Sequence, residues 1–370
     1  MRVLQIIDSL EPGGAERMAV NYANALSKKI EFSGLISTRK QGVLLEEIDE
    51  KVSFLFLRKA KKIDIKSILK LKEYIKKNGI NVVHAHSSSF FLAILVKLIS
   101  PKIVIVWHDH YGISQDLSAR KNLSLKIGSL FFGGVISVNL DLKNWAKSYL
   151  LCSNIIYLPN FIDESTNSDE KLNLEGCEDK RIVCVANLRP QKNHELLIDS
   201  ANLIKEKYPD WTFHVFGKDF EDDYSNKLRK LIEDLKLQKT IFFYGTTNNI
   251  SSALKQSQIA VLPSLSEGLP LAILEYGLNK LPVISTNVGQ ISNVISSDKE
   301  GIIIESNNLK QLVAAIEKLI LDQKYRENLG LTLYNKIKLN FIEEKVTDNY
   351  LMWLNSCTIP AIKNGKSTIK

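Results

Sequence analysis

Cysteine is scarce in this chain, and its few cysteines form no pattern. The 370 residues include Cys152, Cys177, Cys184 and Cys357, and none of these lies at the short spacing that zinc sites use. The sequence leads directly into a strand-like run at residues 3–7, without a cationic leader. We therefore expect a reducing, cytoplasmic setting rather than a disulfide-bonded secreted protein.

Long hydrophobic runs are also missing. The most apolar stretch, residues 90–99, contains Lys97 and has about half the length of a membrane-spanning helix. We therefore expect no segment to cross a membrane. With 45% hydrophobic and 24% charged residues, the composition is that of a globular protein, and the length suits two α/β domains better than one.

Negative charge is scarce in the first part of the chain. Residues 1–160 carry 23 lysines and arginines against 13 acidic residues, whereas the remainder carries 26 against 28. The excess is largest around residues 58–77. Such a basic face suits anionic lipid or a phosphorylated ligand, and it also suits an ordinary solvated helix surface. Nucleic acid is disfavoured, because no recognition motif or series of stacking aromatic residues accompanies the lysines.

Strand-like and helical runs alternate along most of the chain. Helical runs at residues 15–27 and 65–77 lie between β-branched runs, a pattern that predicts parallel sheets covered by helices. The strands are expected at residues 3–7, 32–36, 53–57, 82–85, 103–107, 135–138 and 155–158, then at 182–186, 212–216, 241–244, 259–262, 283–285 and 302–304. We expect a first domain at 1–163, a linker at 164–180 and a second domain at 181–342. A C-terminal helix within 343–370 should pack back toward the first domain and end in a frayed tail at 363–370.

A glycine and a proline follow the strand-like run at residues 259–262. They belong to the segment SEGLPLAILE, residues 266–275, in which Pro270 suits the first position of a helix. Amides at the start of a helix favour a phosphate, and Glu267 and Glu275 can hold two ends of one ligand. An ordinary strand–turn–helix unit with a capping glutamate is the alternative.

In each of the two predicted domains, a further candidate ligand loop follows the first strand. PGGAER at residues 12–17 lets the backbone approach a ligand closely, although its glycine spacing is not that of the dinucleotide-binding fingerprint. NLRPQKN at residues 187–193 places Arg189 and Lys192 close enough to clamp one diphosphate. Asp-x-Asp, with which many sugar transferases hold a metal, occurs nowhere, so side chains and amides would have to neutralise a leaving phosphate. A solvent-facing arginine and lysine are the alternative.

Four of the six histidines follow two strand-like runs. His84 and His86 come after one run, and His108 and His110 after the next. We expect them to cluster at the carboxyl edge of the first sheet, because the ends of parallel strands meet there. A zinc site is disfavoured, since the spacings fit no standard pattern. One or two of these histidines, with His108 foremost, are expected to line a polar cleft; a structural role for all four is the alternative.

Together these motifs resemble glycosyltransferase family 4. The PGGAER loop, HAH at residues 84–86, the NLRPQK loop and SEGLPLAILE occur in the same order in that family, and the resemblance covers essentially the whole chain. Where the family often has Lys-Gly, this chain has Lys192 and Asn193. The resemblance implies an α/β architecture of the GT-B type, in which two doubly wound, Rossmann-like domains face each other across a cleft.

The resemblance also implies roles for individual residues. Arg189 and Lys192 would bind the donor diphosphate, Glu275 the ribose hydroxyls and Glu267 the donor sugar. His108 would contact the sugar near the reacting carbon, with His110 as the alternative one register away. The other implied donor-site residues are loop glycines, backbone amides and one aromatic wall, namely Gly14, Gly217, Tyr244, Gly245, Gly268, Leu269 and Leu271.

The activity implied by the resemblance is sugar transfer with retention of the anomeric configuration. A nucleotide-diphosphate sugar would be the donor, and a glycan or polyprenyl-linked acceptor would supply the hydroxyl, as in bacterial surface polysaccharide synthesis. We expect no metal or other cofactor. The basic first domain and the apolar residues 90–92 favour peripheral contact with an anionic membrane surface. A sugar-nucleotide epimerase of the same fold and a non-catalytic sugar-binding protein are the alternatives.

Overall fold

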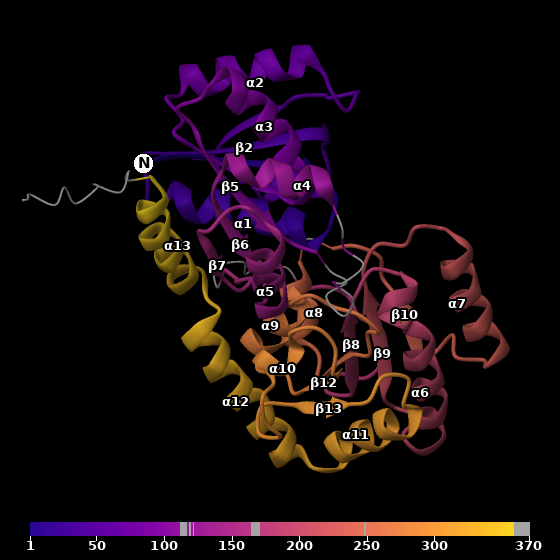
Figure 1. The fold of residues 1–370 in the computed structure, drawn as a ribbon. Helices are drawn as coiled ribbons and strands as arrows, with labels where there is room; N and C mark the ends of the chain where they lie inside the picture. Colours follow the sequence, from indigo (N-terminus) through magenta and orange to yellow (C-terminus); the bar gives the residue numbers. More distant parts are fainter. Residues whose placement is uncertain (112–116, 118–119, 121, 164–170, 248, 359–370) are drawn as a thin grey trace, which may run out of the picture. The chain divides into compact units, whose positions relative to one another are not determined.

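The chain forms two compact units in this computed structural model, which describes residues 1–111, 117, 120, 122–163, 171–247 and 249–358 (Figure 1). The first unit comprises Met1–His110, Lys121–Leu158 and Val346–Lys370, and the second comprises Tyr111–Arg120 and Pro159–Lys345. The expected tail at 363–370 and the first part of the expected linker, residues 164–170, lie outside the described residues.

The first unit is built around a parallel sheet with strand order β3-β2-β1-β4-β5-β6-β7. Its strands are β1 (Arg2–Ser9), β2 (Phe32–Lys40), β3 (Ser53–Phe56), β4 (Val82–His86), β5 (Val104–Asp109), β6 (Phe132–Ser137) and β7 (Ile155–Tyr157). The seven strands predicted for this half are confirmed. One detail is wrong: β4 and β5 extend as far as His86 and Asp109, so three of the histidines expected after strands lie in the last residues of strands.

Two layers of helices cover this sheet. The chain steps toward one edge of the sheet from β1 to β3 and toward the other edge from β3 to β7, so right-handed crossovers leave their helices on opposite faces. One face carries α1 (Gly14–Ser27), and the other carries α2 (Ile65–Lys77), α3 (Phe90–Ile99), α4 (Leu123–Gly128) and α5 (Leu140–Tyr149). Short 3₁₀ turns occur at η1 (Val43–Glu47), η2 (Ser87–Ser89) and η3 (Ser129–Phe131). Helix α13 (Glu343–Thr358) joins this unit, where Tyr350 packs against Tyr22 of α1 with ring centroids 5.1 Å apart.

The second unit contains a parallel sheet with strand order β10-β9-β8-β11-β12-β13. The strands are β8 (Arg181–Val185), β9 (Thr212–Phe216), β10 (Ile241–Phe243), β11 (Ile259–Leu262), β12 (Val283–Thr286) and β13 (Ile302–Ile304). The helices are α6 (His194–Lys207), α7 (Asp223–Asp234), α8 (Ile250–Lys255), α9 (Leu271–Leu278), α10 (Ile291–Val294), α11 (Leu309–Leu321) and α12 (Gln323–Asn340), with the 3₁₀ turn η4 (Pro190–Lys192). The six predicted strands are therefore confirmed.

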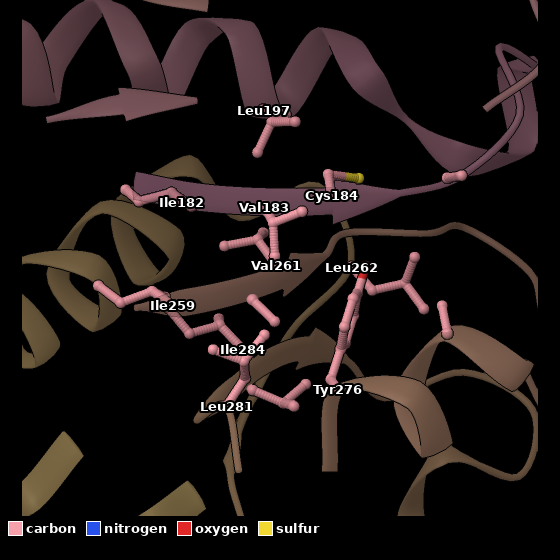
Figure 2. Packing of buried hydrophobic residues seen from close by; sticks show 14 of the residues in the cluster. Ile182, Val183, Cys184, Leu197, Ile259, Val261, Leu262, Tyr276, Leu281 and Ile284 are labelled. Carbon is pink, nitrogen blue, oxygen red and sulfur yellow. The ribbon is translucent and has the colours of Figure 1, made fainter. Parts of the chain in front are cut away.

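The core of the second unit explains why its strands read as continuous apolar runs. Helices cover both faces of the sheet, so nearly all successive side chains of β8, β11 and β12 are buried, and Val185 is partly buried. Figure 2 shows Leu197 of α6 on one side of β8 and Tyr276 of α9 on the other. Each such aliphatic side chain stabilises the fold by roughly 1.5–3 kcal/mol. The Tyr276 hydroxyl also accepts a hydrogen bond from the amide of Val185 at 2.6 Å, which ties α9 to the end of β8.

Residues 171–180, the described part of the expected linker, are attached to the second unit. Leu172 and Leu174 pack against its core. The amide of Leu172 donates to the Ser252 hydroxyl at 2.9 Å, and the Arg181 guanidinium donates to the carbonyls of Leu174 and Glu175. This segment therefore packs against the second unit immediately before its first strand, β8.

No helix among the described residues is both long enough and apolar enough to cross a membrane.

Candidate functional site

The candidate site of the second unit lies where the strand order reverses. Strand β8 has β9 on one side and β11 on the other, so the loops that follow β8 and β11 diverge and leave a crevice of the kind in which α/β sheets bind ligands. Lys192 follows β8 and Glu267 follows β11. Their side chains form an ion pair, with Nζ 2.5 Å from Oε1. Two motifs 75 residues apart in sequence thus meet at one point.

Glu267 is held firmly in this crevice. Its side chain is 7% exposed, and Oε1 accepts hydrogen bonds from both the Lys192 ammonium and the Ser264 hydroxyl, the latter at 2.7 Å. The Ser264 carbonyl accepts a bond from the Thr286 hydroxyl, and the amide of Leu265 donates to the Gln191 carbonyl at 2.8 Å. The carboxylate therefore fixes the position of the Lys192 ammonium, a role that the sequence interpretation did not include.

The loop that carries Lys192 contains a left-handed residue. Asn193 has φ 56° and ψ 47°, a conformation that glycine adopts freely and that asparagine tolerates better than most other residues. This geometry explains how Asn193 can stand where the family often has glycine. Arg189, at the start of the same loop, lies over the ring of Phe220, with its guanidinium carbon 3.6 Å from the ring centroid. In this structure Arg189 and Lys192 therefore contact different partners.

Helix α9 begins one residue later than the sequence predicted. Pro270 has an extended backbone with ψ 127° and occupies the N-cap position, and Leu271 is the first helical residue. The Pro270 carbonyl accepts from the amide of Ile273 at 3.2 Å, so proline caps the helix by its carbonyl instead of filling the first turn. Glu275 lies one turn further along and is half-buried. The sequence placed Glu267 before this helix and Glu275 inside it, and both positions are confirmed.

Further residues shape the loop that carries Glu267, and the sequence interpretation missed them. Gly289 has φ 58°, and a Cβ atom there would lie 2.0 Å from the carbonyl oxygen of Glu267. The next amide, that of Gln290, donates to the Gly268 carbonyl at 2.9 Å, and the Asn160 side chain donates to the Leu269 carbonyl at 2.8 Å. A glycine in the loop that follows β12 was the signal that could have identified this close approach. Around Gly268 itself the space for a Cβ is open.

The three predicted residues near the ends of β9 and β10 also lie together. The Gly217 amide donates to the Gly245 carbonyl at 2.8 Å, and a Cβ on Gly217 would lie 2.1 Å from the Ala186 carbonyl oxygen. Gly245 has φ 71°, which favours glycine. The Tyr244 hydroxyl bonds to His214 Nδ1 at 3.0 Å and accepts from the amide of Glu175 at 3.1 Å. The Tyr244 hydroxyl is therefore bonded within the second unit, and its ring stacks on that of Phe216 with centroids 4.7 Å apart.

In the first unit, the glycine loop opens helix α1. Gly13 is the N-cap residue and Gly14 the first helical residue, exposed to solvent. No atom lies within 4 Å of the position that a Cβ on Gly14 would occupy, so packing alone does not require glycine there. This is the open backbone that the sequence predicted for a close approach by a ligand.

The four histidines of the first unit form one cluster. Nε2 of His84 lies 3.1 Å from Nδ1 of His108, and Nδ1 of His86 lies 3.0 Å from Nε2 of His110. The other nitrogen of His86 bonds to the side-chain oxygen of Gln5 at 2.8 Å. Burial lowers the pKa of all four imidazoles below the usual value, so they are neutral at pH 7.

Exposure separates His108 from His110. His84 and His86 are fully buried and His108 is 1% exposed, whereas His110 is half-buried. His108, which the sequence predicted to face a ligand, is therefore the more buried of the two, and its role stays a prediction. The reason for its burial is that β5 ends at Asp109: His108 still lies inside the strand and contacts His84, whereas His110 is the first residue beyond the strand.

Three of these histidines lie close enough together to hold a metal ion. One nitrogen from each of His84, His86 and His108 lies within 4.8 Å of the other two. Both nitrogens of His86 already take part in hydrogen bonds, so ligation by His86 would replace one of them.

Comparison with known proteins identifies the chain. Residues 12–166 match the family described as Glycosyltransferase Family 4, and residues 165–335 match the one described as Glycosyl transferases group 1. The chain belongs to glycosyltransferase family 4. This family 4 enzyme is 26% identical over 366 residues to the UDP-Gal:alpha-D-GlcNAc-diphosphoundecaprenol alpha-1,3-galactosyltransferase of Escherichia coli, with 91% of this chain and 93% of that protein covered.

One further relative and one solved structure are similar to the family 4 enzyme over nearly its whole length. It is 24% identical over 358 residues to the capsular polysaccharide biosynthesis glycosyltransferase CapH of Staphylococcus aureus, with 95% and 99% of the two chains covered. The crystal structure of Anabaena HepE in complex with UDP and glucose has a TM-score of 0.81 at 17% identity, with 96% and 100% covered. The predicted GT-B fold class, built on two doubly wound, Rossmann-like sheets, is confirmed.

Proposed function

We propose that this family 4 enzyme transfers a sugar from a nucleotide-diphosphate donor to a hydroxyl of a lipid-linked or polymeric glycan in surface polysaccharide synthesis. The observation that carries the proposal is the Lys192–Glu267 pair in the crevice of the second sheet. Support for the acceptor class comes from the Escherichia coli relative, named for a diphosphoundecaprenol substrate, and from the capsular polysaccharide relative CapH. Support for a nucleotide donor comes from HepE, solved with UDP and glucose.

In the proposed reaction, the bond between the anomeric carbon and the leaving phosphate oxygen breaks on the same face on which the acceptor oxygen attacks. The acceptor hydroxyl gives its proton to the departing phosphate oxygen, so that no enzyme nucleophile is needed and the anomeric configuration is retained. Negative charge grows on the diphosphate as the bond breaks. Lys192 and Arg189 lower the barrier because their positive charge stabilises the transition state more than the bound donor. Glu267 holds the Lys192 ammonium in place, and no metal takes part.

His110 takes the contact with the donor sugar in this proposal. It is the half-buried member of the histidine cluster, and it bonds to His86, which in turn bonds to Gln5. Since the pKa of His110 is lowered by burial, the ring is a neutral hydrogen-bonding group rather than a charged one at pH 7. His108 lies behind it and fixes the packing of the cluster through His84.

The stereochemical proposal is tested by following the reaction by proton NMR. UDP-sugars are offered together with a short lipid-diphosphate-linked sugar as acceptor, and we expect a product whose new bond has the donor's anomeric configuration. A product of inverted configuration would overturn the same-face mechanism. Conversion of the donor into an epimer in the absence of acceptor would instead favour an epimerase.

Glu275→Ala should weaken nucleotide binding without disturbing the fold. Glu275 is proposed to hold the ribose hydroxyls, and the loss of a hydrogen bond to a charged group lowers affinity by roughly 10- to 100-fold. The measurement is isothermal titration calorimetry with UDP alone. Glu233→Ala, which removes an exposed carboxylate from α7, is the matched control and should leave the affinity unchanged. If both variants bind UDP like the parent, the ribose assignment is wrong.

A further inference from the structure

Exposed apolar side chains gather on one helical layer of the first unit. Helices α2, α3 and α4 cover the same face of the sheet and pack side by side (Figure 1). Six large hydrophobic side chains of this layer are 50% to 70% exposed, namely Ile63, Ile65, Leu69, Leu98, Leu123 and Ile127. We refer to these six as the α2–α4 surface. Scattered apolar residues need no explanation, but a group of them on one layer marks an interaction site.

Lysines accompany the apolar residues on helix α2. The buried side of this helix carries Ser67, Leu71 and Ile75. The opposite side carries a stripe at three- and four-residue intervals, which consists of Ile65, Leu69, Lys72 and Lys76. Lys66 is also exposed, and residues 58–77 as a whole contain nine lysines and arginines against two acidic residues. The solvent-facing side of α2 is therefore both apolar and strongly basic.

The apolar residues that first suggested a membrane contact are not part of this surface. Phe90 is 9% exposed and Leu92 is 1% exposed, because both side chains pack into the core of the first unit. Phe90 and Leu92 are thus ordinary core residues at the start of α3, whereas Phe91 between them is half-buried, with the Lys62 ammonium 5.5 Å from its ring centroid. The exposed apolar residues lie instead at positions that the sequence pattern did not single out.

We propose that the α2–α4 surface docks on an anionic lipid bilayer. Aliphatic side chains beside lysines are what a helix lying in the membrane interface presents, since the side chains enter the apolar boundary while the ammonium groups stay near the headgroups. The net positive charge of residues 58–77 complements the negative surface potential of such a membrane. This proposal goes beyond sugar transfer and does not depend on it.

The chemistry of the surface favours lipid over nucleic acid. All six of its exposed hydrophobic residues are leucines or isoleucines. Single-stranded nucleic acids are bound by aromatic side chains on which bases stack, and this group of residues contains none. A polyanion that binds through the lysines alone would not require the apolar residues, and the experiment below uses this difference.

Vesicle flotation with the full chain tests the proposal. The parent protein should float with vesicles of phosphatidylglycerol and phosphatidylethanolamine and remain unbound with phosphatidylcholine alone. The triple variant K66E/K72E/K76E should bind the anionic vesicles at least about tenfold more weakly, because each lysine near the surface contributes to attraction. The double variant I65S/L69S should lower binding by about tenfold, since it removes the apolar insertion but keeps the charge.

A charge-matched control distinguishes the effect of the α2–α4 surface from the effect of the protein's net charge. The variant K230E/K239E/K324E makes the same charge change at exposed lysines of the second unit and should float like the parent. Equal loss in this control, full binding by I65S/L69S, or no flotation of the parent would overturn the proposal, as would tighter binding to single-stranded RNA than to vesicles. Sugar transfer to a water-soluble acceptor should be unchanged in K66E/K72E/K76E, so a failure of the lipid proposal can be told apart from a failure of the proposed activity.

Discussion

Lys192→Ala should lower turnover by roughly 100- to 1,000-fold, the range expected when one preorganised group that stabilises transition-state charge is removed. The Lys192 side chain is 22% exposed and its ammonium is held by Glu267 at 2.5 Å, so it reaches the crevice in a fixed position. The measurement is the steady-state kcat at saturating UDP-sugar, together with the KM of the acceptor. The KM of the neutral acceptor should change little, because the lysine acts on the leaving diphosphate.

The control for this experiment concerns Glu267, the ion-pair partner of Lys192. Removal of Lys192 leaves the Glu267 carboxylate buried without its counter-charge, which destabilises the loop irrespective of catalysis. The double variant K192A/E267Q removes this buried charge and should fold normally while remaining slow, whereas Lys230→Ala on α7 should be fully active. Near-parental turnover of K192A/E267Q would remove Lys192 from the mechanism.

Acidification should unfold this protein in a cooperative step between about pH 6 and pH 4. All six histidines have a pKa below the usual value of 6.5, chiefly because of burial. The unfolded chain therefore binds more protons than the folded one below pH 6.5, and the free energy of unfolding falls as the pH falls. Above pH 6.5 the histidines add no pH dependence. Their combined effect is large relative to a typical total stability of about 5–15 kcal/mol.

His194 offers a way to isolate one part of this effect. It is fully buried at the start of α6, and burial lowers its pKa to about 4. Because the folded protein holds this imidazole neutral, about 3 kcal/mol of the free energy of unfolding is lost as the pH falls from 6.5 to 4. Urea unfolding followed by circular dichroism at several pH values should therefore show a shallower acid dependence for His194→Leu than for the parent. An identical pH dependence of the two proteins would contradict the assignment.

Much of the fold could be predicted from the sequence because its local signals agree. The strands at residues 212–216, 259–262 and 302–304 have the bounds that their β-branched runs indicated, and α2 spans the predicted residues 65–77. Such runs are reliable when both faces of a parallel sheet are buried, since nearly every residue of the strand must then be apolar. The ends of elements were less predictable: β4 includes His84 and His86, β5 includes His108, and α9 starts after Pro270.

The candidate site was only partly visible in the sequence. The motifs that contain Lys192 and Glu267 were recognisable as ligand loops, but nothing in their spacing showed that the two side chains pair. Gly289 and Ser264 were missed because each acts on Glu267 from a separate loop or through a single hydrogen bond. The difference in burial between His108 and His110 depends on where β5 ends, and a sequence with histidine at both positions does not fix that end.

The sequence by itself determined the family, the two sheets and the loops that carry charge, because these depend on local patterns of burial and turn formation. The tertiary structure alone decided which charges meet, which histidine is exposed and which apolar residues face solvent. Those properties depend on contacts between segments far apart in the chain, such as the 75 residues that separate Lys192 from Glu267. The physical reason is that burial is a property of the packed molecule: Leu92 and Leu69 have the same side chain, and only the layer of helices around them places one in the core and leaves the other exposed.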